Sequence, residues 1–242
     1  MARANKKPKP EFDVLIDGFS HDGRGVGRVD GKAVFITGAL VGEQVRAQLI
    51  AKNKHFDEAK VLELITTSSN RIEPKCQHFG ICSGCVLQHM SADKQIEAKQ
   101  TTLLDNLRRI GHVQPQQILP VLTAEPWGYR RKGRFSVRYV EKKGGVLVGF
   151  REIDPRFVAD LKSCDTLLPE LSQLIVPLAN LINSTQAKQE IRQIEFIAGD
   201  GPIALVIRNF ITLPESDLAL LREFELNNPV QLYLQPGDIS TV

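Results

Sequence analysis

Residues 11–66 carry a pattern of five short apolar stretches separated by glycine-rich turns. The stretches predict strands at residues 12–16, 26–29, 33–36, 43–50 and 57–65. The pair Asp30-Gly31, between the second and third strands, is typical of a tight β-hairpin. Short strands in this number, joined by turns, predict a small all-β barrel of the OB type.

The glycine stretch Gly23-Arg-Gly-Val-Gly27 resembles a nucleotide-binding loop only superficially. It lacks the third glycine at the required offset, and it leads into a strand rather than a helix. We therefore interpret it as a bulged, sharply turned strand of the barrel.

The remainder of the chain predicts an α+β domain. We expect an amphipathic helix at 93–110, where Ile96, Leu103, Leu107 and Ile110 would face a core. Further helices are expected at 169–184 and 216–226, and strands at 118–122, 133–140, 146–151, 191–197, 202–210 and 230–234. The expected organisation is a basic disordered tail (1–10), the barrel (11–68), a cysteine loop (69–92) and an α+β central domain (93–242), truncated at its C-terminal end.

Charge is distributed unevenly along the chain. Residues 1–156 hold 26 Lys and Arg against 17 Asp and Glu, whereas residues 157–242 hold 5 against 11. A basic first part favours a polyanionic partner. No apolar run approaches the length of a membrane span, and no apolar stretch follows the basic N-terminus. We therefore expect a cytoplasmic protein without membrane association.

The four cysteines form a C-x5-C-x2-C group, Cys76, Cys82 and Cys85, with Cys164 far along the chain. Three local thiolates and one distant thiolate are typical of a [4Fe–4S] cluster. A structural zinc site more often uses two C-x2-C knuckles, and only one is present, although His78 and His89 keep zinc open. Two disulfides are disfavoured in a reducing compartment.

Residues 127–138 interleave five basic residues with three aromatic ones. Cations bind phosphates, and aromatic rings stack on unpaired bases. In a strand, Arg130, Lys132 and Arg134 should point to one side, and Arg131, Phe135 and Val137 to the other. With the neighbouring Phe150 and Arg151, this stretch predicts an RNA-binding surface.

These motifs together resemble the first half of the bacterial 23S ribosomal RNA uracil-C5 methyltransferases that carry an iron–sulfur cluster. Residues 18–28 and Val41-Gly-Glu43 are similar to their TRAM domain, an OB-like RNA-binding barrel. The cysteine group with Gln88-His89 is similar to their cluster motif. Tyr129-Arg-Arg-Lys132 and Gly149-Phe-Arg151 match their central domain.

The resemblance implies a set of site residues. Cys76, Cys82, Cys85 and Cys164 would hold a [4Fe–4S] cluster. The RNA contacts would come from the barrel and from the basic strand with its neighbours: Arg24, Arg28, Lys52, Lys54, Phe56, Arg130, Arg131, Lys132, Arg134, Phe135, Phe150 and Arg151. The partner would be 23S ribosomal RNA rather than DNA, and the protein a monomer.

The family also has a doubly wound methyltransferase domain, which binds S-adenosylmethionine and supplies a catalytic cysteine. No strand, glycine loop and helix suited to that cofactor follows residue 170, and all four cysteines are assigned as ligands. We therefore expect no catalytic or cofactor-binding residue in this chain, and no methylation by the chain alone. The alternative is a zinc- or cluster-stabilised RNA-binding module without enzymatic activity.

Overall fold

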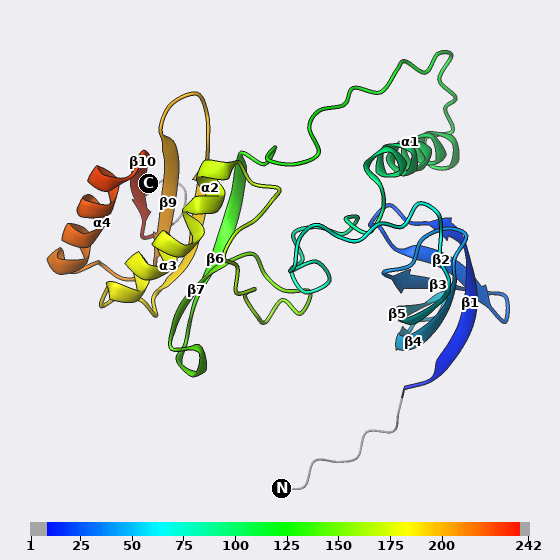
Figure 1. Ribbon diagram of the computed structural model, residues 1–242, viewed down its shortest axis with the longest axis horizontal. Coiled ribbons are helices and arrows are strands. Elements are labelled where there is room, and N and C mark those ends of the chain that lie inside the picture. Colours follow the sequence, from blue (N-terminus) through cyan, green and yellow to red (C-terminus); the bar gives the residue numbers. More distant parts are fainter. Residues whose placement is uncertain (1–8, 238–242) are drawn as a thin grey trace, which may run out of the picture. The chain divides into compact units, whose positions relative to one another are not determined.

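The computed structural model describes residues 9–237, so most of the expected basic tail and the last five residues lie outside the described part. The chain divides into two compact units. The first comprises Met1–Pro74 and Val86–Leu122, and the second Lys75–Cys85 and Thr123–Val242 (Figure 1).

The first unit contains a closed five-stranded barrel, as the sequence predicted. Its strands follow the order β1-β2-β3-β5-β4, and only β3 and β5 pair in parallel. They are β1 (Glu11–Phe19), β2 (Gly25–Val29), β3 (Lys32–Thr37), β4 (Gln44–Lys52) and β5 (Phe56–Thr66). Alternate side chains fill the interior, among them Val14, Ile16, Val34, Ile36, Val45 and Ala59.

Glycines set the tight geometry of the β1–β2–β3 segment. Asp30 and Gly31 have φ angles of 49° and 79°, the left-handed values that the predicted β2–β3 hairpin requires. A Cβ on Gly27 would lie 2.6 Å from the Leu15 carbonyl oxygen, so β2 can approach β1 closely only with glycine there. The β1–β2 register shifts between Ile16 and Gly18. The extra residue is Asp17, so the bulge lies in β1 and not in the glycine stretch, where the sequence predicted it.

Helix α1 (Ala92–Arg109) forms where the sequence predicted it, but it does not bury the expected apolar face. None of its residues is buried, and Leu103 and Ile110 are 57% and 76% exposed. The strand predicted at 118–122 is also wrong. These residues are irregular and exposed, because the segment has no partner strand and Pro120 interrupts any ladder.

The second unit is built on a five-stranded sheet of order β10-β9-β8-β6-β7. Its strands are β6 (Lys132–Val140), β7 (Gly145–Gly149), β8 (Ile191–Ile197), β9 (Ile203–Asn209) and β10 (Val230–Gln235). A short 3-10 turn, η1 (Glu141–Lys143), joins β6 to β7. Helix α4 (Glu215–Asn227) connects β9 to β10, which pair in parallel, and the other pairs are antiparallel.

Helices cover one face of this sheet. The predicted helix at 169–184 is divided at Leu174 into α2 (Pro169–Gln173) and α3 (Ile175–Ser184). Pro177 explains the interruption, since its nitrogen cannot donate to the preceding turn. Buried side chains of the helices and strands form one core, including Leu171, Ile175, Leu178, Ile182, Phe135, Ile194, Phe196, Leu205 and Ile207. Within residues 9–237, no helix has both the length and the apolar character to cross a membrane.

Candidate functional site

The loop predicted at 69–92 is divided between the two units. Its residues 75–85, from here on called the cysteine loop, belong to the second unit and contain no helix or long strand. It folds on itself through the Cys82 amide, which donates to the His78 carbonyl oxygen at 2.9 Å. It also pairs with the segment after β7. The Ser83 amide donates to the Arg151 carbonyl oxygen at 2.9 Å, and the Ile153 amide to the Ile81 carbonyl oxygen at 2.8 Å. Main-chain hydrogen bonds therefore fix this loop at the edge of the second unit, which we call the sheet domain.

The fourth cysteine is held beside this loop. The Cys164 amide donates to the Ser172 hydroxyl at 2.8 Å, and the Cys164 sulfur lies 3.3 Å from the Thr166 hydroxyl. Lys75, next to Cys76, forms an ion pair of 3.4 Å with Asp165, next to Cys164. This ion pair connects the loop to the distant segment.

All four thiols are free of disulfides and half-buried. Burial raises the pKa of Cys76, and the neighbouring Cys164, Asp165 and Cys85 raise it further. The pKa of Cys82 is likewise raised by burial and by Cys164, Cys85 and Cys76. Cys164 and Cys85 thus act on the pKa of both Cys76 and Cys82.

Two of the four cysteine sulfurs accept hydrogen bonds from backbone amides. Amide hydrogens of His78 and Gly84 point at the Cys76 and Cys82 sulfurs, the latter at 3.3 Å, and such bonds stabilise thiolates. In the described part of the chain, no three His, Cys, Asp or Glu side chains are arranged to hold a metal ion as they stand. The chemistry of four thiols with backbone donors fits an iron–sulfur cluster.

The basic strand is β6, and its alternation agrees with the prediction for Lys132 and Arg134 on one side and for Phe135 and Val137 on the other, whereas Arg130 and Arg131 precede the strand. Arg131, Lys132 and Arg134 are exposed, with the Arg134 guanidinium 3.3 Å from Glu195. The Arg130 guanidinium lies over the Phe150 ring at 4.6 Å. Arg131 precedes the strand and therefore does not follow its alternation. Residues 131–134 therefore present three exposed basic side chains, Arg131, Lys132 and Arg134.

Two predicted stacking residues are corrected. Phe135 is fully buried, with its ring centroid 4.6 Å from Phe196 and 5.4 Å from Phe150. Phe150 is only 7% exposed. Both rings belong to the core on the helix side of the sheet, so neither is available to an RNA base. Arg151 is exposed, as expected.

The predicted barrel contacts differ in availability. Arg24 forms ion pairs with Asp22 at 2.8 Å and Glu58 at 3.4 Å, and its guanidinium lies 4.7 Å from the Phe35 ring centroid. Arg28 is exposed, with one hydrogen bond to a carbonyl oxygen, and Lys52 and Lys54 are also exposed. Phe56 is half-buried and meets the Phe35 ring edge-on. Arg24 and Phe56 therefore already have partners within the barrel.

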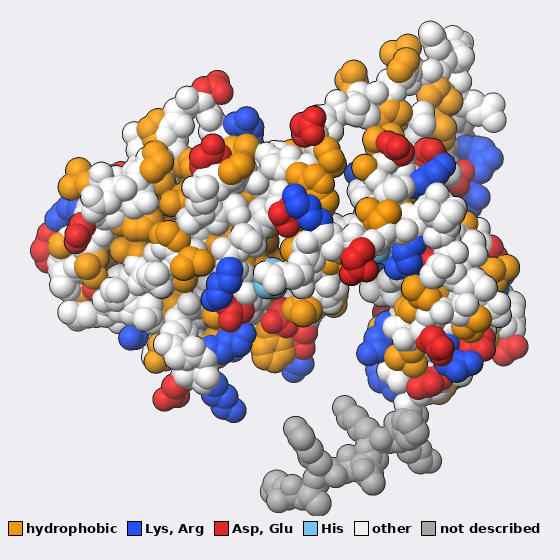
Figure 2. Space-filling model, in the orientation of Figure 1, with side chains coloured by type: hydrophobic (Ala, Val, Ile, Leu, Met, Phe, Trp, Pro, Cys, Tyr) orange, Lys and Arg blue, Asp and Glu red, His pale blue; other side chains and the backbone are white. Residues whose placement is uncertain are grey.

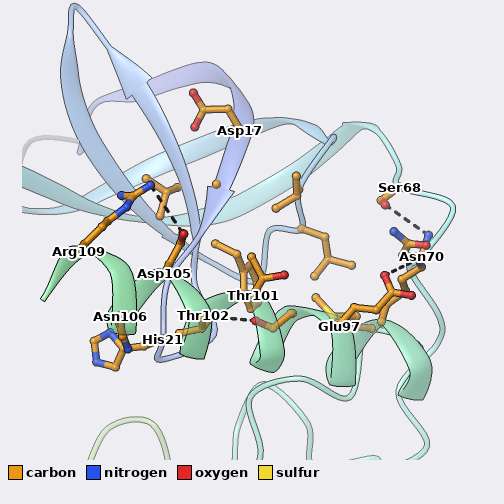
Figure 3. Close-up of a pocket in the computed structure, with 18 residues that line it drawn as sticks. Asp17, His21, Ser68, Asn70, Glu97, Thr101, Thr102, Asp105, Asn106 and Arg109 are labelled. Atoms are coloured by element: carbon orange, nitrogen blue, oxygen red, sulfur yellow. Dashed lines mark hydrogen bonds and ion pairs between the residues drawn. The ribbon is translucent and has the colours of Figure 1, made fainter. Parts of the chain in front are cut away.

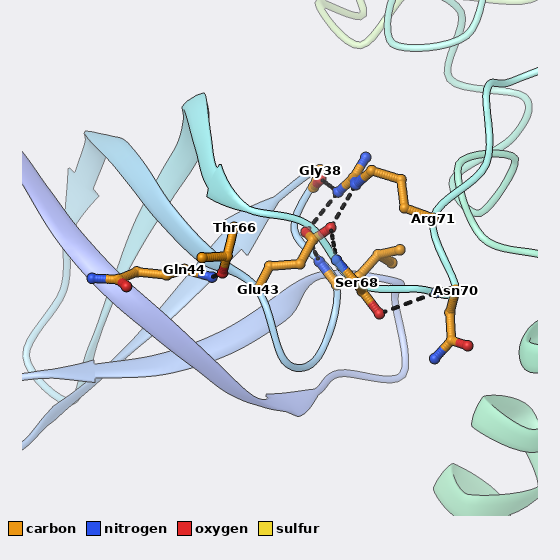
Figure 4. A network of polar contacts seen from close by, with 8 residues as sticks. Gly38, Glu43, Gln44, Thr66, Ser68, Asn70 and Arg71 are labelled. Atoms are coloured by element: carbon orange, nitrogen blue, oxygen red, sulfur yellow. Dashed lines mark hydrogen bonds and ion pairs between the residues drawn. The ribbon is translucent and has the colours of Figure 1, made fainter.

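A buried ion pair at the end of the barrel went unrecognised in the sequence (Figure 4). Glu43 is fully buried, and its two oxygens accept hydrogen bonds from Arg71 at 2.6 and 2.7 Å. The Leu40 and Ser68 amides donate to the same carboxylate at 2.8 and 3.2 Å. Arg71 also donates to the Gly38 carbonyl oxygen at 2.7 Å. No local pattern identifies a partner 28 residues away.

His89 lies in the environment of this pair, in the first unit. Burial, and after it the nearby Arg71, lower its pKa to about 4, although Glu43 acts in the opposite direction. Burial alone would raise the pKa of Glu43, but the hydrogen bonds from Arg71, Leu40 and Ser68 hold it below its usual value. His89, one of the two histidines that kept zinc open, is therefore neutral and buried beside an ion pair.

A groove of about 700 Å³ lies between the barrel and α1, both in the first unit (Figure 3). Asp17, His21 and Ser68 line one wall, and Thr101, Asp105 and Arg109 line the other. Asp105 and Arg109, one turn apart on α1, form an ion pair of 3.7 Å. None of the residues predicted to bind RNA lines this groove.

Comparison with known proteins gives consistent matches. The TRAM domain model matches residues 7–62. The chain is 51% identical over 245 residues to the 23S rRNA (uracil(1939)-C(5))-methyltransferase RlmD of Xylella fastidiosa (strain 9a5c). It is 52% identical over 246 residues to the protein of the same name from Xanthomonas euvesicatoria. Both matches cover the whole chain but 55% of the relative, so the chain spans about half the length of these relatives.

A solved structure also has a similar fold. It is the Pyrococcus abyssi tRNA (uracil-54, C5)-methyltransferase in complex with S-adenosyl-L-homocysteine, with a TM-score of 0.60 and 18% identity. The match covers 86% of this chain and 48% of that one. These findings confirm the resemblance to the 23S rRNA uracil-C5 methyltransferases that the sequence motifs indicated.

Proposed function

We propose that this chain is the RNA-recognition and iron–sulfur portion of an S-adenosylmethionine-dependent 23S rRNA uracil-C5 methyltransferase, which makes 5-methyluridine. The observation that carries the proposal is the identity of about half of all residues, over the whole chain, to relatives named for that activity. The TRAM match and the exposed cations of β6 support it independently. Such an enzyme acts in the cytoplasm, and we expect this chain to be monomeric.

In this proposal the two units select the substrate. Exposed Arg131, Lys132 and Arg134, with Arg28, Lys52 and Lys54 of the barrel, bind RNA phosphates. The target uridine leaves its stack before reaction, because its reacting atoms are enclosed in structured RNA.

The chemistry requires groups beyond these two units. Uracil C5 becomes nucleophilic only after a thiolate adds at C6, which calls for a free thiolate and a site for S-adenosylmethionine. The four cysteines are reserved as cluster ligands, so we place both functions in the part of the relatives that this chain does not span. The chain alone should therefore transfer no methyl group to RNA.

Cys76, Cys82, Cys85 and Cys164 would hold the [4Fe–4S] cluster. With all four irons ligated by thiolates, the group supplies a structural cross-link rather than a substrate-binding position. The residues of the chain support that role, because the cysteine loop already pairs with the segment after β7, and the segment of Cys164 with α2.

The metal content tests the cysteine assignment. We expect about four irons and four sulfides per chain, with absorption near ~400 nm, in protein purified without oxygen. Cys164→Ser should lose the iron, whereas Ser83→Ala, in the same loop, should keep it. One zinc and no iron would favour the alternative, a zinc-stabilised RNA-binding module.

RNA binding tests the rest of the proposal. The chain should bind a folded 23S rRNA fragment more tightly than a shuffled fragment of equal length. It should transfer no labelled methyl group from S-adenosylmethionine to either fragment. Equal affinity for both RNAs would contradict a role in selecting the substrate, and methyl transfer would contradict the absence of a catalytic site.

A further inference from the structure

The second face of the sheet in the sheet domain carries a basic stripe. Strand alternation places Lys132, Arg134, Ser136 and Arg138 on the side of β6 opposite the buried Phe135 and Val137. The three basic side chains are exposed. Lys132 and Arg134 are about 7 Å apart and Arg134 and Arg138 about 14 Å, since each strand residue advances the chain by about 3.4 Å. Such a row suits the repeating phosphates of an extended polynucleotide strand.

The charge of the stripe is only partly neutralised. Glu195 of β8 lies opposite Arg134 of β6 and forms an ion pair with it at 3.3 Å. Arg208 of β9 is half-buried on the same side, in register with Gln193. Within the described residues, Lys132 and Arg138 form no ion pair, so positive charge remains for an anionic partner.

An exposed aromatic ring lies at the Arg138 end of the stripe. The Arg138 guanidinium donates to the carbonyl oxygen of Arg156, and Phe157 follows directly. The Phe157 side chain is 49% exposed, and the Arg156 guanidinium lies 5.6 Å from its ring centroid. An exposed ring beside a guanidinium can stack on an unpaired base.

The ring is presented by an ordered segment. The Phe157 amide donates to the Asp154 carbonyl oxygen at 3.0 Å, and the Glu152 amide to the Phe157 carbonyl oxygen at 3.1 Å. The same segment pairs with the cysteine loop through the amide of Ile153. Main-chain bonds on both sides therefore preorganise Phe157, which lowers the entropic cost of binding.

We propose that Lys132, Arg134 and Arg138 form a track for an extended single strand of RNA, and that Phe157 stacks on one of its unpaired bases. The proposal rests on the proposed function in requiring RNA as the partner, and it adds Arg138 and Phe157 to the contacts expected from the sequence. It also supplies the stacking ring that the buried Phe135 and Phe150 cannot provide.

The test uses the whole chain and a labelled single-stranded RNA of about 12 nucleotides, a length suited to stacking platforms. Fluorescence anisotropy gives the affinity, and a 2-aminopurine base reports stacking by quenching. Phe157→Ala should weaken binding about tenfold and abolish the quenching, whereas Phe157→Trp should retain both. Arg134→Ala with Arg138→Ala should lower the slope of log affinity against log salt by about 1.4.

Phe210 provides a matched control. Its ring is 56% exposed, with the Arg208 guanidinium 5.8 Å away, so it resembles Phe157 in both respects. Phe210→Ala should leave affinity and quenching unchanged. Equal losses in both phenylalanine variants, or no loss in Phe157→Ala, would overturn the assignment of Phe157.

The outcomes separate this inference from the proposed function. If Phe157→Ala and the double arginine variant bind single-stranded RNA normally while the 23S fragment is still selected, only the track is wrong. If the unmodified chain binds neither RNA, the proposed function itself fails. A circular dichroism spectrum identical to that of the unmodified chain establishes that each variant is folded.

Discussion

The barrel and the β6 segment are both rich in basic residues, but they use them differently. In the barrel, Arg46 pairs with Asp13 at 2.9 Å and Lys32 with Asp57 at 2.6 Å. On the face drawn in Figure 2, positive and negative side chains are mixed over this unit. In contrast, Arg131 and Lys132 are exposed and form no ion pair with any residue in 9–237. The two regions therefore differ in how many basic residues are unpaired, and the unpaired ones lie on the surface that we propose for RNA.

Their stability also has different origins. The barrel closes its hydrogen-bond ladder and buries an ion pair at its end, so it is complete in itself. The second unit includes an irregular loop in which burial, and then the neighbouring cysteines, raise the pKa of Cys76 and of Cys82. Four predictions test this contrast, and they follow in order of decreasing effect.

The largest effect is expected from the buried ion pair of the barrel. Glu43→Ala leaves Arg71 and two amides without their acceptor, so it should lower the free energy of unfolding by about 3–5 kcal/mol. Hydrogen exchange over residues 11–66 measures the barrel, while the fluorescence of Trp127, the single tryptophan, reports the other unit. Glu63→Ala, which removes an exposed partner of Arg46, should have little effect. Equal changes in both variants would show that burial of Glu43 is unimportant.

The next effect concerns RNA affinity. Replacing Arg130, Arg131 and Lys132 with alanine should weaken binding of a 23S fragment about 100-fold, since three charge-assisted contacts are lost. Replacing the paired Arg24, Lys32 and Arg46 changes the net charge equally but should weaken binding far less. Filter binding at several salt concentrations measures both variants. The contrast between the two units would be wrong if the two triple variants lost affinity equally.

Acid should destabilise the first unit. His89 has a folded-state pKa of about 4 against 6.5 in the unfolded chain, so the unfolded state binds more protons between these values. Stability should therefore fall by up to about 3 kcal/mol as the pH decreases from 6.5 to 4. The lowered pKa of Glu43 adds a loss below 4.5, as its carboxylate is protonated. Urea unfolding followed by circular dichroism at several pH values tests this.

Two variants check the source of the pH dependence. His89→Gln should flatten the change between pH 6.5 and 4, because the buried titrating group is gone. His55→Gln, at an exposed position, should leave the profile unaltered. A profile that is unchanged by His89→Gln would assign the acid sensitivity to another group.

The smallest effect is the difference in stability between alanine variants of two glycines in one hairpin. Gly27→Ala places a Cβ against the Leu15 backbone oxygen at 2.6 Å and should cost about 3 kcal/mol. Gly31→Ala meets no atom within 4 Å and pays only for its left-handed φ, about 1 kcal/mol. Thermal unfolding of the two variants measures the difference. The reverse order would mean that β1 and β2 are less closely packed than described.

The sequence alone determined the elements with strong local signals. Alternation and the Asp30-Gly31 turn located the five barrel strands, and periodicity located α1, α4 and the strands of the sheet. The types and spacing of the four cysteines predicted that they form a group, and their role as ligands stays a prediction. Local chemistry suffices in these cases, because backbone preferences and side-chain period act over a few residues.

Tertiary structure decided what each side chain faces. The apolar stripe of α1 predicted burial, yet the helix buries no residue, because burial depends on a partner surface that periodicity cannot specify. Phe135 and Phe157 are both phenylalanines near arginines, but the sheet turns one into the core and leaves the other exposed. Glu43 and Arg71 meet only because the barrel closes. Exposure, pairing and neighbouring charge result from contacts between distant segments, and these decide which basic and aromatic residues can reach RNA.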